Sequence, residues 1–194
     1  MTALPDVSGV PHPPTWLLYP HRWFGRLVVR RRVTVREHGT SNLPPDGPVI
    51  VSTTHTESQD QPEFALFGPR PVHRVRFVPG HVNLGALKTS LRVLADGHVV
   101  GLSFEDQRGA AYLALVSGSP VVPLTILGTQ HPRGGRVDLV YGAPYRTTAL
   151  AWPRTKKQVD ATSLDLRVHL LVALDAARSL TARRLSGPIP GGSA

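Results

Sequence analysis

The 194-residue chain contains no cysteine. This absence excludes disulfide bonds, a thiolate nucleophile and zinc or iron–sulfur sites built on cysteine. Long apolar runs are also missing, since no stretch approaches the roughly 18 residues that a membrane-spanning helix needs. The N-terminus lacks the charged region, apolar core and cleavage site of an export signal. The sequence therefore predicts a chain that neither spans a membrane nor is exported, and a cytoplasmic location fits it.

Lysine and acidic residues are scarce. Only three of the 22 cationic side chains are lysine, and 13 acidic residues leave a net charge of +9. Such an excess points to phosphates, anionic lipid or nucleic acid as partners, although GC-rich coding explains an arginine-rich, proline-rich chain equally well. No nucleic-acid-binding signature accompanies the charge, so we expect no nucleic-acid partner and rank that function last. A glycine-rich phosphate loop and a Gly-x-Ser-x-Gly elbow are also absent, which disfavours several large enzyme classes.

The two ends of the chain differ in composition from its middle. Residues 1–15 hold four prolines and no hydrophobic period, which predicts a disordered or extended leader. Residues 16–184 are expected to form a single domain, and residues 185–194 a frayed tail. At the start of the domain, residues 16–32 mix Trp16, Tyr19, Trp23 and Phe24 with five arginines. This mixture suits the lipid headgroup zone, but an ordinary helix with a solvated arginine face would have the same composition.

Short apolar runs typical of strands alternate along the domain with apolar patterns of helical spacing. Strands are expected at 33–39, 48–55, 73–80, 98–105, 120–128 and 136–142, and helices at 61–67, 84–95, 109–118 and 155–184. The last helix opens with a capping box, and its apolar stripe is expected at Leu164, Val168, Leu171 and Leu174. The alternation predicts a three-layer α/β domain with a mostly parallel sheet.

A histidine and an aspartate follow the second expected strand, as His55 and Asp60 in HTESQD. The spacing alone is weak evidence, but ligands of α/β sheets bind beyond the carboxyl ends of strands. A neutral imidazole can take the proton of a hydroxyl nucleophile, and a carboxylate on its other nitrogen fixes the tautomer. The pair is therefore a candidate base and orienter, although Asp60 also suits a helix N-cap.

Four stretches in this order resemble the glycerolipid acyltransferase family typified by the PlsC-type 1-acyl-glycerol-3-phosphate acyltransferases. They are NLPPDGPVIVSTTHTESQD, VVGLSFEDQRGAAYLAL, SPVVPLTILGT and RVDLVYGAPY, and the resemblance covers residues 39–145. It implies an α/β enzyme at the cytoplasmic face of the membrane that moves an acyl chain from a CoA or carrier-protein thioester to a hydroxyl. It implies no cofactor or metal, and a role in phospholipid or glycolipid synthesis.

The resemblance also assigns roles to single residues. His55 matches the family's base and Asp60 its orienter, while Thr54 stands where the family has asparagine. Glu105 matches the acceptor-binding glutamate. Pro123 matches the proline of the fourth motif, although a plain core strand explains it as well. The family's phosphate-binding arginine has no counterpart, so Arg108 is the nearest candidate cation, facing the cleft or paired with Glu105 or Asp106.

Three functions stay open from the sequence. The first is an active acyltransferase that uses a lipid or another hydroxyl acceptor and works as a peripheral protein at the inner face of the cell membrane. The second is a catalytically impaired homologue that binds lipid or membrane. The third is the nucleic-acid-binding protein that the charge alone suggests.

Overall fold

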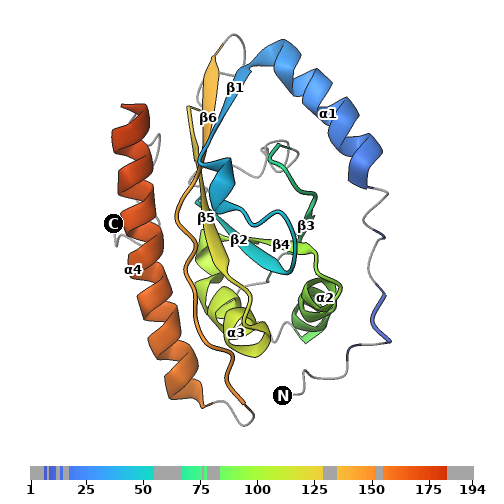
Figure 1. Ribbon diagram of the computed structural model, residues 1–194, viewed down its shortest axis with the longest axis vertical. Helices are drawn as coiled ribbons and strands as arrows, with labels where there is room; N and C mark the ends of the chain where they lie inside the picture. The colour runs from blue at the N-terminus through green and yellow to red at the C-terminus, as the bar shows by residue number, and fades with distance from the viewer. Residues whose placement is uncertain are drawn as a thin grey trace.

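A six-stranded sheet forms the centre of the molecule (Figure 1). The computed structural model describes residues 7, 9–11, 14, 18–54, 67–75, 77, 84–128, 135–151 and 155–182. Its strands are β1 (Thr34–His38), β2 (Val49–Thr54), β3 (Val72–Arg74), β4 (Val99–Ser103), β5 (Val121–Leu127) and β6 (Arg136–Tyr141). They lie in the order β1-β6-β5-β2-β4-β3. All neighbouring strands are parallel except β5 and β6, which are antiparallel.

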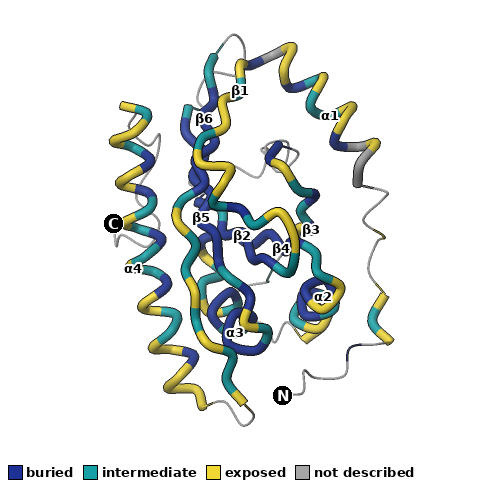
Figure 2. The backbone as a smooth tube through the Cα atoms, viewed as in Figure 1, coloured by how far each residue is buried: buried dark blue, intermediate teal, exposed yellow. Residues whose placement is uncertain are grey.

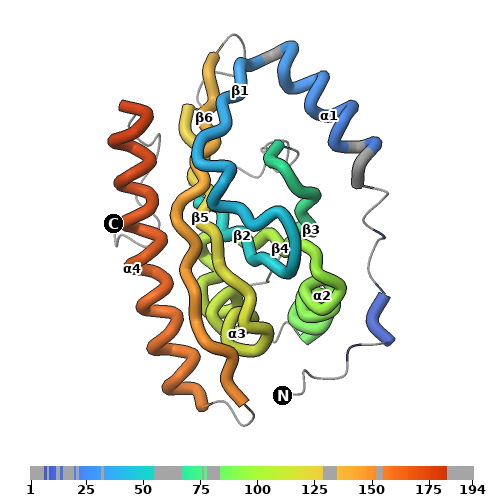
Figure 3. The backbone as a smooth tube through the Cα atoms, in the orientation of Figure 1, coloured from blue at the N-terminus to red at the C-terminus, as the bar shows by residue number. Residues whose placement is uncertain are grey.

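Helices cover both faces of this sheet. They are α1 (Leu18–Arg32), α2 (Leu84–Ala95), α3 (Gln107–Ser117) and α4 (Lys156–Thr181). The short 3-10 helices η2 (Thr40–Asn42) and η4 (Phe104–Asp106) follow β1 and β4. Figure 3 traces the path of the chain through the labelled helices and strands. Residues of α2, α3 and α4 pack on one face, and residues of α1 pack on the other. The three-layer α/β architecture with a mostly parallel sheet is therefore confirmed.

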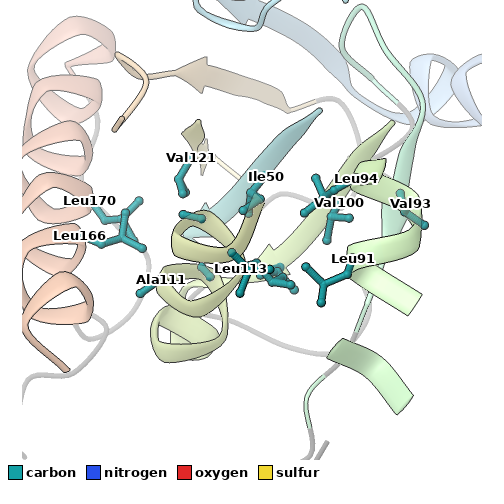
Figure 4. Packing of buried hydrophobic residues seen from close by; sticks show 14 of the residues in the cluster. Ile50, Leu91, Val93, Leu94, Val100, Ala111, Leu113, Val121, Leu166 and Leu170 are labelled. Atoms are coloured by element: carbon teal, nitrogen blue, oxygen red, sulfur yellow. The ribbon is translucent and has the colours of Figure 1, made fainter. Parts of the chain in front are cut away.

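The core has two main parts, one on each face of the sheet. In the larger part, Ile50 and Val121 of the central strands meet Leu113 of α3 and Leu166 and Leu170 of α4 (Figure 4). The smaller part joins residues of the opposite face to α1: Val29, Val33, Phe67, Val122, Leu139 and Tyr141. The central strands β2 and β5 are buried almost throughout, as their continuous apolar runs lead one to expect.

The final helix begins as its sequence predicts. The Thr155 side chain accepts from the Gln158 backbone, and the Gln158 side chain accepts from the Thr155 backbone, so the capping box is confirmed. The expected stripe is wrong at Leu164 and Val168, which are exposed. The helix instead buries Val159, Leu166, Leu170, Leu174 and Ala177. Both stripes have helical spacing, so only the position of the sheet decides which one is covered.

Two other expectations differ from the structure. Of the strand expected at 73–80, the described part is strand only to Arg74: Val75 donates its N–H to the Gly101 carbonyl, and Phe77 packs against Gly109 of α3. Residues 76 and 78–80 lie outside the described residues. Of the helix expected at 61–67, only Phe67 is described, and it is not helical. In the leader, Val7 is buried and belongs to the larger core cluster.

No helix among the described residues is long and apolar enough to cross a bilayer.

The burial of α4 gives a direct test of its orientation. We expect Leu166→Ala to lower the free energy of unfolding by about 2–5 kcal/mol, because the side chain is 0% exposed and leaves a cavity. Leu164→Ala removes the same atoms two residues away, from a side chain that is 66% exposed, and should cost under about 0.5 kcal/mol. Urea denaturation of both variants measures the difference. Equal losses would contradict the observed orientation of the helix.

Candidate functional site

The carboxyl ends of β2 and β4 lie side by side at one edge of the sheet. These parallel strands are in register with Thr53 beside Ser103, so both chains leave the sheet at the same level. Carboxyl ends of parallel strands are where α/β sheets bind their ligands. The segment that leaves β2 carries His55 and Asp60, which both lie outside the described residues. Their catalytic roles therefore stay predictions, while the frame around them is described.

Thr54 ends β2 with its side chain turned into the sheet. It is buried, and its hydroxyl donates to the Leu124 carbonyl of β5 over 3.2 Å. Most buried side-chain hydroxyls are hydrogen-bonded in this way. This bond explains Thr54 structurally, and a contact between Thr54 and substrate stays a prediction.

Glu105 and Asp106 follow β4 at the same edge, in η4. Glu105 is exposed, which leaves its carboxylate accessible. Asp106 is more enclosed, and desolvation by burial raises its pKa most, with a smaller increase from the neighbouring Glu105 charge. Hydrogen bonds from the backbone of Ser103 and Phe77 oppose this and lower the pKa. Asp106 therefore joins the end of β4 to the chain that follows β3.

Arg108 pairs with a different residue from those expected. Its Nη2 lies 3.0 Å from Oδ1 of Asp160 in α4, and both side chains are well exposed. No ion pair of Arg108 with Glu105 or Asp106 is seen among the described residues, and a contact between Arg108 and substrate stays a prediction. An ion pair this exposed contributes little to stability. The pair links the first turn of α3 to α4.

Pro123 lies in the buried strand β5 and contacts the turn after β6. Its carbonyl accepts the Gly142 N–H over 2.9 Å. A Cβ added at Gly142 would lie 3.0 Å from that of Ala173 and 3.2 Å from that of Pro123, so glycine lets β5 and α4 approach each other there. The surroundings of Pro123 match a plain core strand.

A contact that sequence reasoning missed joins α1 to the chain after the predicted dyad. Nη2 of Arg22 and Nη2 of Arg26 each donate to the carbonyl of Gly68 over 2.6 Å. The guanidinium groups of Arg26 and Arg30 lie 5.7 and 5.8 Å from the centre of the buried Phe67 ring. The sequence signal for these contacts is that Arg22, Arg26 and Arg30 follow one another at intervals of four residues. A solvated helix face has the same spacing.

A second missed cluster lies on β6. Asp138 is only 1% exposed, and its two carboxylate oxygens lie 3.0 Å from His38 Nε2 and 2.9 Å from Arg136 Nε. A buried carboxylate is tolerated when it is paired and hydrogen-bonded, and here Arg136 and His38 supply the partners. Nowhere in the described part of the chain do three histidine, aspartate or glutamate side chains gather as a metal site would require.

Comparison with known proteins supports the architecture. The structure resembles the crystal structure of the 1-acyl-sn-glycerophosphate (LPA) acyltransferase PlsC from Thermotoga maritima, with a TM-score of 0.58. The fold is PlsC-like. The alignment covers 87% of this chain and 82% of that chain, with 21% sequence identity. No family model and no curated protein matches the sequence. The similarity at this level of identity shows the fold, and the expected family is supported by fold alone.

Asp106 gives a prediction about pH. Because its pKa is raised above the ordinary value of 3.8, the folded chain binds a proton there more tightly than the unfolded chain does. The stability that this proton contributes is present below 3.8 and is lost as the pH rises through the raised pKa. The wild type should therefore gain stability relative to Asp106→Asn as the pH falls from neutral. Urea unfolding across this range measures it, with the exposed Asp46→Asn as matched control, and identical pH profiles of the two variants would contradict it.

Proposed function

We propose that this protein is an acyltransferase that moves an acyl chain from a CoA or carrier-protein thioester to a hydroxyl acceptor. The observation that supports this most is the shared edge of β2 and β4 in a PlsC-like fold. The segment with His55 and Asp60 leaves one strand there, and η4 with Glu105 follows the other. The sequence resemblance joins the same two segments in one site.

The proposed reaction needs one base and its orienting carboxylate. His55 takes the proton of the acceptor hydroxyl while the oxygen attacks the thioester carbonyl, and Asp60 stabilises the imidazolium that forms. The tetrahedral intermediate then expels the thiolate, which receives the proton from His55. The new oxygen ester and the free thiol are the products. This chemistry uses the donor and acceptor as substrates and asks for no metal or cofactor.

The charges at the strand edge favour a neutral acceptor. Glu105 is exposed beside Asp106, and Arg108 is engaged by Asp160. An acceptor phosphate brought to the two acids of η4 would be repelled, whereas a neutral hydroxyl would not. We therefore propose a lipid or other alcohol whose hydroxyl is the reacting group, within phospholipid or glycolipid synthesis.

The outward face of α1 supports work at a membrane surface. Trp23 is 72% exposed, Phe24 64% and Leu27 42%. Figure 2 shows exposed and buried stretches alternating along α1, as on a helix with one covered face. The helix carries five arginines and no acidic residue. Aromatic rings beside cations are the combination that binds the interface of an anionic bilayer. We propose peripheral binding at the inner face of the cell membrane.

His55→Ala and Asp60→Asn should each remove nearly all acyl transfer, because a base and its orienter act as one unit. The measurement is transfer from labelled acyl-CoA to a panel of hydroxyl acceptors, with unfolding curves to show that the variants fold. Their losses should not add in the double variant. If His55→Ala turned over within about threefold of the wild type, the proposed mechanism would be wrong. A wild type that binds vesicles but transfers nothing would favour the impaired homologue.

Replacing both Trp23 and Phe24 by serine should release the chain from vesicles of phosphatidylcholine and phosphatidylglycerol, because the apolar part of interfacial binding is lost. Co-sedimentation measures the bound fraction. The matched control replaces Leu164 and Val168 by serine, since these are also exposed apolar residues but lie on α4. Release by the control to the same extent would show that α1 is not the binding surface.

A further inference from the structure

The outer side of α4 carries an apolar row that no other element of the described fold covers. Leu164, Val168 and Val172 follow one another at intervals of four residues and are 66%, 55% and 63% exposed. Residues four apart are neighbours on a helix surface, so these three side chains, the outer row of α4, form a continuous stripe. The opposite side of the helix is buried through Leu166 and Leu170. Contiguous apolar surface of this kind marks an interaction site more often than scattered apolar residues do.

The outer row faces away from α1. Residues of α4 pack on one face of the sheet and residues of α1 on the other, as Figure 1 shows. An occupant of the outer row therefore leaves the exposed aromatic residues of α1 accessible. The two helices also differ in charge, because α1 carries five arginines and no acid, whereas α4 carries four cations and three acids. A nearly neutral surface with an apolar centre and a charged rim suits another protein surface and offers an anionic bilayer little attraction.

Two opposite charges flank the outer row at matching distances. Lys157 lies seven residues before Leu164, and Asp175 lies seven residues after Val168. Seven residues are about two helical turns, so both charges are on the same side of the helix as the row. Both residues are exposed. The other two acids of α4 already have partners in their own chain, in the pairs Asp160–Arg108 and Asp165–Tyr145.

We propose that a second copy of this chain covers the outer row, with the two α4 helices packed antiparallel around a two-fold axis. In this register Leu164 of each copy lies against Val168 of the other. The matching distances then bring Lys157 of each copy level with Asp175 of the other, so one arrangement covers the apolar rows and forms two ion pairs. A parallel arrangement would set each of these charges beside its own copy instead. A two-fold interface uses the same patch on both copies and closes at the dimer.

The size of the face determines how strong this dimer is. At 1.5 Å per residue, the 26-residue α4 is about 39 Å long. A strip of this length that is one helix wide is smaller than the roughly 800 Å² per partner of a standard interface. Exposed ion pairs at its rim add little. We therefore expect a dissociation constant of about 10–100 μM, so that the chain is monomeric when dilute.

A charge exchange tests the register. Lys157→Glu and Asp175→Lys each place like charges level with one another, and each should weaken self-association about tenfold in sedimentation equilibrium from about 1 to 300 μM. An equimolar mixture of the two variants should associate about as tightly as the wild type, because in the mixed dimer each new charge meets an opposite one. The two positions are 18 residues apart in one chain, which is about 27 Å along the helix. No contact within a single copy can therefore restore the association.

A second variant tests the apolar row itself. Val168→Glu places an acid at the centre of the proposed interface and should abolish the dimer over the same concentrations. The matched control is Leu180→Glu, which changes an apolar residue that is 64% exposed on the same helix. In the proposed register Leu180 comes level with residue 152, before α4 of the other copy begins, so this control should associate like the wild type. Urea unfolding curves show whether both variants fold, and if Val168→Glu does not, the charge exchange decides alone.

Three results would overturn the proposal. The first is a wild type that stays monomeric at every concentration tested. The second is a mixture of the two charge variants that associates no better than either variant alone. The third is a dimer that Leu180→Glu weakens as much as Val168→Glu does. A monomeric wild type whose vesicle co-sedimentation is lost in Val168→Glu would assign the outer row to a bilayer instead. None of these measurements depends on acyl transfer, so the proposed function is tested separately.

Discussion

The pairing of β2 with both β4 and β5 is the constraint on which the rest of the structure depends. β2 is buried on both faces, and its backbone must find partners on both sides because no water is available there. The register with β4 and β5 then determines which residues end at the same level. The hydroxyl of Thr54 completes this arrangement by bonding across to β5. The proposed site depends on that register, since β2 and β4 end side by side.

Much of the fold is predictable from local patterns in the sequence. Short apolar runs separated by helical periods predict buried parallel strands, and the capping box at Thr155 predicts the start of α4 to the residue. The rotation of α4 could not be predicted in the same way. Two pairs of apolar residues have the same helical spacing, Leu164 with Val168 and Leu166 with Leu170. Which pair is buried depends on where α3 and β5 lie. Local propensity decides that a helix forms, and tertiary packing decides how it is turned.

The site shows the same division. That the candidate residues follow the carboxyl ends of two neighbouring strands could be inferred from the sequence, because ligands of parallel sheets bind beyond those ends. The pairing of side chains was harder to predict from the sequence. Arg108 meets Asp160 from a helix that begins about fifty residues later, and Arg22 meets Gly68 across a similar distance. When only the residues near it in the sequence are considered, an arginine on a helix is expected to face solvent. Its long side chain and five donors let it serve a distant carbonyl instead.

The antiparallel step between β5 and β6 has a consequence for the N-terminal helix. Because β1 is parallel to β6, it runs opposite to β2, and its first residue lies at the edge where β2 ends. Since α1 leads directly into β1, the helix ends near the carboxyl ends of the central strands. A parallel β6 would have sent α1 to the opposite edge of the sheet. The antiparallel pairing of β5 and β6 thus places the end of α1 at the same end of the sheet as the proposed catalytic residues.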